Sequence, residues 1–129
     1  MSRICTGLLV FLAACAGPEE RAVAYLSREV PAWPVENRCY SCHNNGDAAR
    51  ALMAARDVDP RVLESTLRFL RAPEAWKDNG PDGEFSDQRL AALQFGFALA
   101  ATPRPGPELQ RAAALVASLQ EVDGSWNFD

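Results

Sequence analysis

The sequence predicts an all-α domain of about six helices, and three observations point to this fold class. The residues after the N-terminal segment are rich in alanine, leucine and arginine and hold little isoleucine or threonine, a composition that favours helices. Apolar residues recur at helical spacing in several stretches. Acidic residues, serines and prolines occur where helices would start. The 129 residues suffice for one domain with a buried core.

The first helix is expected to begin at Pro18, because a proline in the first turn followed by two acidic residues suits a helix N-terminus. Pro31 and Pro34 are expected to end it, since proline has no amide hydrogen to donate within a helix. Its apolar face would consist of Ala22, Val23, Leu26 and Val30.

A short helical turn is predicted over residues 35–43. It would place Cys39 and Cys42 on one face, because residues i and i+3 are neighbours on a helix. Residues 44–46, Asn-Asn-Gly, would end this turn with a left-handed C-cap. Asp47 would cap the next helix.

Asp59 and Pro60 indicate another helix start, for a helix through Leu70. Residues 73–85 contain Asn-Gly-Pro-Asp-Gly and predict an exposed loop. Ser86 would cap the following helix. The apolar stripe of that helix would be formed by Leu90, Leu93, Phe97 and Ala101. The remaining segments are a stiff proline-rich connector at 102–107 and a last helix at about 108–120.

Three copies of a helical repeat are predicted, with a spacing of about 45 residues that is typical of helical repeat proteins. Each copy has an apolar pair followed by a tryptophan. The pairs are Tyr25-Leu26, Phe69-Leu70 and Leu115-Val116, and the tryptophans are Trp33, Trp76 and Trp126. The alternative is that the three tryptophans are core residues at helix ends.

The third copy is the most complete, with Arg111-Ala112, Leu115-Val116, Gln120 and Gly124-Ser125-Trp126. This pattern resembles the QW repeat of the squalene/hopene cyclase and prenyltransferase α/α toroids. The resemblance implies helical hairpins stacked around a curve, with Gln120 and Trp126 tying the end of one helix to its neighbour. A toroid has about twelve helices and this chain about six, so self-association, another protein or a longer chain is expected to cover the open end.

The catalytic features of that family do not carry over. The acidic D-x-D-D cluster of the cyclases has one near match, Asp57-Val58-Asp59, which runs into Pro60. No Asp/Cys/His zinc set is available, because the single histidine lies in another motif. The sequence also lacks G-x-S-x-G, a phosphate-binding glycine loop and a Ser/His/Asp set. We therefore expect no terpenoid chemistry, and a non-enzymatic role is favoured.

The motif Cys39-Tyr40-Ser41-Cys42-His43 has the C-x-x-C-H spacing of a c-type haem attachment site. Cys39 and Cys42 would bind the two vinyl groups of one haem, and His43, the only histidine, would be the proximal iron ligand. One alternative is a Cys39–Cys42 disulfide followed by an incidental histidine. Another is half of a zinc site, although zinc needs about four ligands and the sequence has no second Cys/His pair.

A sixth iron ligand would have to come from the opposite face of the haem. After the N-terminal segment the chain offers one thioether, Met53, and one amine, Lys77. Met53 follows His43 by only ten residues, a tight return around a haem, and a core-filling role is favoured for it. A vacant, water-bound or partner-supplied sixth position would lower the reduction potential relative to His/Met ligation.

The N-terminus predicts export. Residues 1–14 have the form of a signal peptide, with Arg3 before an apolar run that is too short to span a bilayer comfortably. Leu12-Ala13-Ala14-Cys15 resembles a bacterial lipobox, which implies cleavage before Cys15 and lipidation of that residue. Ala16 is not the aspartate linked to inner-membrane retention, so the outer membrane is favoured. An ordinary secretory signal cut at this point is the alternative, and it gives an exported protein too.

Together these observations predict a short tether at 15–20 and a helical repeat domain at 21–129. The expected function is an exported, lipid-anchored c-type haem protein that transfers electrons or bears haem, with the membrane and a redox protein as partners. A net charge of −4 without basic runs argues against nucleic-acid binding. One rival is a haem-free toroid fragment for binding or scaffolding, with a disulfide. Another is an enzyme whose partner half supplies the active site.

Overall fold

All regular secondary structure in the part of the chain described by this computed structural model, residues 17–80 and 88–127, is helical. This confirms the predicted all-α fold class. The elements are α1 (Pro18–Asn37), the π-helix η1 (Cys42–Ala48), α2 (Ala49–Ala54), the 3₁₀ helix η2 (Pro60–Leu63), α3 (Glu64–Leu70), the 3₁₀ helix η3 (Pro73–Asp78), α4 (Gln88–Ala100) and α5 (Pro107–Ser118). Because η1 continues into α2 and η2 into α3, the described chain forms six consecutive helical rods.

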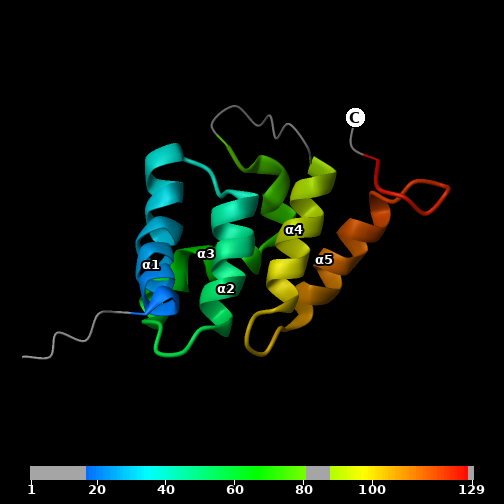
Figure 1. The fold of residues 1–129 in the computed structure, drawn as a ribbon. Helices are drawn as coiled ribbons and strands as arrows, with labels where there is room; N and C mark the ends of the chain where they lie inside the picture. The colour runs from blue at the N-terminus through cyan, green and yellow to red at the C-terminus, as the bar shows by residue number, and fades with distance from the viewer. Residues whose placement is uncertain (1–16, 81–87, 128–129) are drawn as a thin grey trace, which may run out of the picture.

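The helices α1, α2, α4 and α5 stand in a row, with α3 behind them (Figure 1). Buried side chains form two groups along this row. The α1 cluster comprises Val30, Ala49, Leu52 and Leu63. The α4 cluster comprises Leu70, Trp76, Ala91, Ala92, Phe95, Ala98, Leu99 and Ala112. The rod made of η1 and α2 contacts both α1 and α4, so it joins the two halves of the core.

The first helix begins where the sequence predicted but continues further. It starts at Pro18, and the Gly17 amide donates to the Glu20 carboxylate at 2.7 Å. The helix then runs through Pro31 and Pro34, so the prediction that these prolines end it is wrong. It stops only where Arg38 takes a left-handed backbone conformation, with φ of 54°.

A hydrogen bond from the next rod compensates for one of these prolines. Pro34 has no amide hydrogen, so it cannot bond to the carbonyl of Val30, four residues earlier. The Nδ2 of Asn45 donates to that carbonyl oxygen instead, at 3.0 Å. Since Val30 and Asn45 are both fully buried, this bond satisfies a carbonyl that water does not reach.

The segment 44–46 does not end a helix, and Asp47 does not cap one. Both predictions are wrong, because these residues lie inside η1. The cap is Ser41, whose Oγ accepts from the amides of His43 and Asn44 at 3.1 and 3.2 Å. Asn and Gly are common at helix ends, but here Asn45 and Gly46 are buried against neighbouring helices.

Two further predicted helix boundaries are confirmed. Asp59 caps the rod that starts at Pro60, and its Oδ1 accepts from the Arg61 amide at 3.0 Å. The last helix, α5, ends at Ser118, within two residues of the predicted end. The predicted connector at 102–107 lies between α4 and α5.

The predicted loop at 73–85 is wrong over its first half. Residues 73–78 form η3, and Trp76 is only 3% exposed. Asn79 is also buried, because its side chain bonds to the main chain of a distant residue. Residues 81–85 of that loop and the predicted Ser86 cap lie outside the described residues.

The apolar stripe predicted for α4 is on the wrong face. Phe97 is 61% exposed and Leu90 37% exposed. The buried face consists of Ala91, Ala92, Phe95, Ala98 and Leu99. Since α4 is apolar on several faces, its residue spacing cannot select one, and the small alanines pack closest to the neighbouring helices.

Two of the three repeat tryptophans make the same kind of hydrogen bond. The indole Nε1 of Trp76 donates to the Phe69 carbonyl at 3.2 Å, and that of Trp126 donates to the Val116 carbonyl at 2.9 Å. In both cases the acceptor belongs to the apolar pair that the repeat defines. The indole nitrogen of Trp33 is buried and has no hydrogen-bond partner among the described residues.

The bonds of the third copy differ from those that the toroid resemblance implies. Trp126 bonds to its own helix, and Gln120 donates to the nearby Gly124 carbonyl at 2.7 Å. The link to the neighbouring helix comes from Arg89 of α4, which donates to the Asn127 carbonyl at 3.0 Å. The toroid therefore stays a resemblance in sequence pattern.

Candidate functional site

The C-x-x-C-H motif lies where α1 gives way to the second rod. Cys39 follows the left-handed turn at Arg38, and Cys42 is the first residue of η1. The two residues between them are not helical. The prediction of a helical turn over 35–43 is therefore wrong, and something other than helix geometry must hold the two cysteines.

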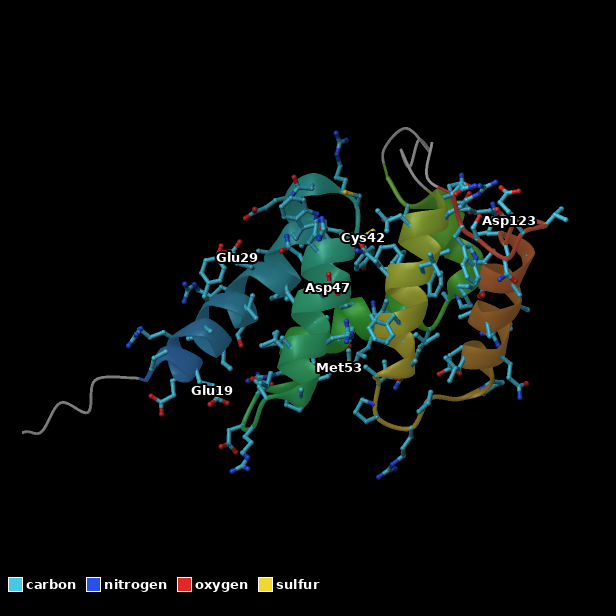
Figure 2. The ribbon with its side chains drawn as sticks, turned by 45° about the vertical axis from the view of Figure 1, so that its right-hand side comes forward. Glu19, Glu29, Cys42, Asp47, Met53 and Asp123 are labelled. Carbon is cyan, nitrogen blue, oxygen red and sulfur yellow. The ribbon has the colours of Figure 1, made fainter. Side chains whose placement is uncertain are left out.

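The motif presents two partly buried thiols and an exposed imidazole. Neither Cys39 nor Cys42 is in a disulfide, and Cys42 packs against the α4 cluster. Figure 2 places Cys42 near the end of its helical rod, facing α4. His43 is exposed, and no hydrogen bond of its imidazole is present among the described residues. Because both thiols are only partly buried and the imidazole is exposed, all three groups can be reached from solvent.

Tyr40 is held by three kinds of contact. The side-chain amide of Asn79 bonds both ends of its main chain: Oδ1 accepts from the Tyr40 amide at 2.7 Å, and Nδ2 donates to its carbonyl at 2.8 Å. The Tyr40 ring stacks on Phe69 with a centroid distance of 4.0 Å and an interplanar angle of 7°. Its hydroxyl lies 2.8 Å from the Ser65 hydroxyl. The first residue between the cysteines is thus fixed at backbone, ring and hydroxyl.

Ser41, the second residue between the cysteines, is fixed by Asn45. The Ser41 amide donates to Asn45 Oδ1 at 2.9 Å. The Asn45 Nδ2 also donates to the Thr66 hydroxyl at 2.8 Å, in addition to the Val30 carbonyl. Asn45 and Thr66 are fully buried, so these bonds are shielded from water.

Of the other predicted site residues, Met53 is not brought to the motif. Met53 lies at the far end of the η1–α2 rod from Cys42 (Figure 2) and packs against the α1 cluster. Lys77 lies on η3 and bonds to the Asp78 carboxylate at 2.8 Å. The predicted lipidation site, Cys15, and the signal segment 1–14 are outside the described residues. The structure therefore offers no support for Met53 as a sixth iron ligand.

Asn45, Asn79 and Ser65 are site residues that sequence reasoning missed. Asn45 and Asn79 both stand next to glycine, a pairing that normally indicates turns, and nothing nearby in sequence reveals their buried partners. Tyr40 and Asn79 are 39 positions apart, so only the tertiary fold brings them together.

No group of three or more histidine, cysteine, aspartate or glutamate side chains is arranged to hold a metal ion directly within residues 17–80 and 88–127. A haem-type attachment makes a different demand, since the two sulfurs bind carbon and only the imidazole binds iron. Two partly buried thiols outside any disulfide, on either side of a fixed dipeptide, and an exposed imidazole fit that demand.

The chain matches no protein-family model, no curated protein and no solved structure. Within residues 17–80 and 88–127, none of the helices has the length and apolar character needed to cross a membrane.

Proposed function

We propose that this protein is an exported, lipid-anchored c-type haem protein that transfers electrons or bears haem on a helical scaffold. The observation that carries the proposal is the arrangement of the side chains in the Cys39–His43 motif. Neither thiol is in a disulfide, hydrogen bonds hold the residues between them, and the neighbouring imidazole is exposed and makes no hydrogen bond to the described residues. The lipobox-like stretch before Cys15 supports export, and haem c is attached outside the cytoplasm in bacteria.

The roles of the motif residues follow from their chemistry. Cys39 and Cys42 would each add their S–H across one vinyl group, which forms two thioether bonds and releases nothing. His43 would bind the iron through a neutral imidazole nitrogen. When bound, haem supplies an iron that exchanges single electrons between its ferrous and ferric states. The partly buried Cys42 would hold its thioether against the α4 cluster, while His43 stays at the surface.

A second candidate is a haem-free binding module. It is favoured by an apolar groove of about 500 Å³ between α4 and α5, lined by Leu93, Gln94, Gly96, Phe97, Ala100, Leu109, Ala112, Ala113 and Val116. In this case Cys39 and Cys42 would form a disulfide. Both candidates predict an exported protein, so the cysteines decide between them.

The test is co-expression of the full chain with a haem c maturation system, followed by tryptic mass spectrometry. Cleavage after Arg38 and Arg50 releases the peptide 39–50, which contains the whole motif. We expect this peptide to gain the mass of one haem and the denatured protein to keep a c-type absorption spectrum. A peptide that has only lost two hydrogens would establish the disulfide and reject the haem proposal.

Variants assign the roles of individual residues. Cys42→Ala should abolish the two-thioether product, and His43→Ala should leave the thioethers but change the spectrum. Met53→Leu is the matched control on the same rod, and we expect it to leave both the spectrum and the haem content unchanged. A changed spectrum in Met53→Leu would instead identify Met53 as a ligand.

A further inference from the structure

We infer that Asn79 is a positioning residue for the cysteine pair, and that it fixes the separation of Cys39 and Cys42 by clamping Tyr40. This inference rests on the proposed function of the motif. Asn79 is only 6% exposed, and its amide makes both bonds to Tyr40 that a neighbouring β-strand would make. Two bonds from one planar group allow a single orientation of the clamped residue.

A second set of contacts, through Phe69 and Trp76, also connects Tyr40 to η3. Tyr40 stacks on Phe69, and the Phe69 carbonyl accepts from the indole of Trp76. Trp76 belongs to η3, the short helix that leads directly to Asn79. The stacking on Phe69 and the bonds to Asn79 therefore both hold Tyr40 against η3 and the end of α3. A shift of Asn79 relative to Tyr40 would have to break both.

The clamp replaces the rigidity that a helix would have given the motif. Cys39 precedes Tyr40 directly, and Cys42 follows Ser41, which Asn45 holds. Since the backbone between the cysteines is fixed at both residues, the distance between the two thiols is set by buried amides. Neither cysteine is in a disulfide in this arrangement, so the clamp favours the dithiol over the disulfide.

The experiment measures the dithiol–disulfide equilibrium of the haem-free full chain in glutathione buffers. In this reaction the two thiols lose two protons and two electrons, which reduce one glutathione disulfide to two glutathione molecules. The mass of the tryptic peptide 39–50 reports the fraction oxidised, and Cys5 and Cys15 fall in a different peptide. We expect Asn79→Ala to shift the equilibrium toward the disulfide by about tenfold, which is about 30 mV for a two-electron couple.

Asn37→Ala is the matched control, because Asn37 is an exposed amide whose side chain, among the described residues, bonds only to a carbonyl of its own helix. It should leave the equilibrium within about twofold of the wild type. If Asn79→Ala does not fold, Asn79→Asp keeps the acceptor for the Tyr40 amide and loses the donor, and it should shift the equilibrium in the same direction by less. Folded Asn79 variants with the wild-type equilibrium would overturn the inference.

The outcome is separable from that of the proposed function. Haem attachment is scored on the wild-type chain, whereas the clamp is scored on haem-free protein. A wild-type chain that takes no haem, together with a shifted Asn79→Ala equilibrium, would reject the haem proposal and support the clamp. Haem attachment to the wild-type chain, together with an unchanged Asn79→Ala equilibrium, would support the haem proposal and reject the clamp.

Discussion

Replacing Asn45 by alanine should destabilise the fold more than any exposed substitution in η1. The variant removes three hydrogen bonds of one side chain, to the Ser41 amide, the Val30 carbonyl and the Thr66 hydroxyl. Asn45 is fully buried, so water cannot replace these partners without opening the interface between α1 and η1.

The size of the effect follows from these bonds. A typical hydrogen bond contributes about 1 kcal/mol net, and a buried polar group left without a partner costs about 1–3 kcal/mol. Three bonds, one of them to a carbonyl that Pro34 leaves free, give an expected loss of about 3–5 kcal/mol in the free energy of unfolding. That is a large part of the roughly 5–15 kcal/mol that stabilises a typical domain.

Urea unfolding followed by far-ultraviolet circular dichroism measures this loss. Asn44→Ala is the matched control, since Asn44 is the adjacent residue on the same rod and its side chain makes no hydrogen bond in the described structure. A double-mutant cycle adds a sharper test. Pro34→Ala restores an amide that can bond to Val30, so Asn45→Ala should cost about 1 kcal/mol less in that background. Equal midpoints for Asn45→Ala and Asn44→Ala, or no coupling to Pro34, would refute the reasoning.

Three further predictions concern other parts of the fold. The Arg61 side chain and amide lower the pKa of Asp59 from 3.8 to about 2, so the carboxylate stabilises the fold above pH 4 and this contribution is lost as the pH falls to about 2. Thermal unfolding of Asp59→Ala should therefore differ from the wild type at pH 7 and converge with it near pH 2, and a constant difference would contradict this origin. Trp76→Phe removes a buried indole bond to α3 and should cost about 1–2 kcal/mol in urea unfolding; an unchanged midpoint would show that the bond contributes nothing. Gly46→Ala should stabilise by up to about 1 kcal/mol because a Cβ would meet its nearest atom at an ordinary 3.8 Å, whereas Gly124→Ala should destabilise because φ is +87°, and the opposite pair of signs would disprove the backbone argument.

Sequence reasoning found the features that depend on adjacent residues. The start of α1 at Pro18, the Asp59 cap and the extent of α5 each follow from side chains within a few positions of the boundary. The continuation of α1 through Pro31 and Pro34 could not be found this way. One compensating group, the Asn45 amide, lies 15 positions beyond the carbonyl that it satisfies.

The error in α4 has a different physical cause. Its residues offer apolar side chains in several directions, so helical spacing alone allows more than one buried face. The fold buries the face that carries Phe95 and the alanines, and Phe95 packs edge-on against Phe69 at 5.0 Å. The exposed Phe97 carries the Arg50 guanidinium over its ring at 3.8 Å. Such choices depend on partners elsewhere in the chain, which spacing does not encode.

The exposure of His43 can be derived from the same buried amide that holds Ser41. The buried residues of the η1–α2 rod are Asn45, Gly46, Ala49 and Leu52, at helical spacing, and Asn45 is the first of them. Because its bond to the Val30 carbonyl helps to fix the rotation of the rod, a residue two positions earlier is turned toward solvent, where His43 lies. The Asn45 side chain thus holds Ser41, on one side of Cys42, and sets the exposure of His43, on the other side.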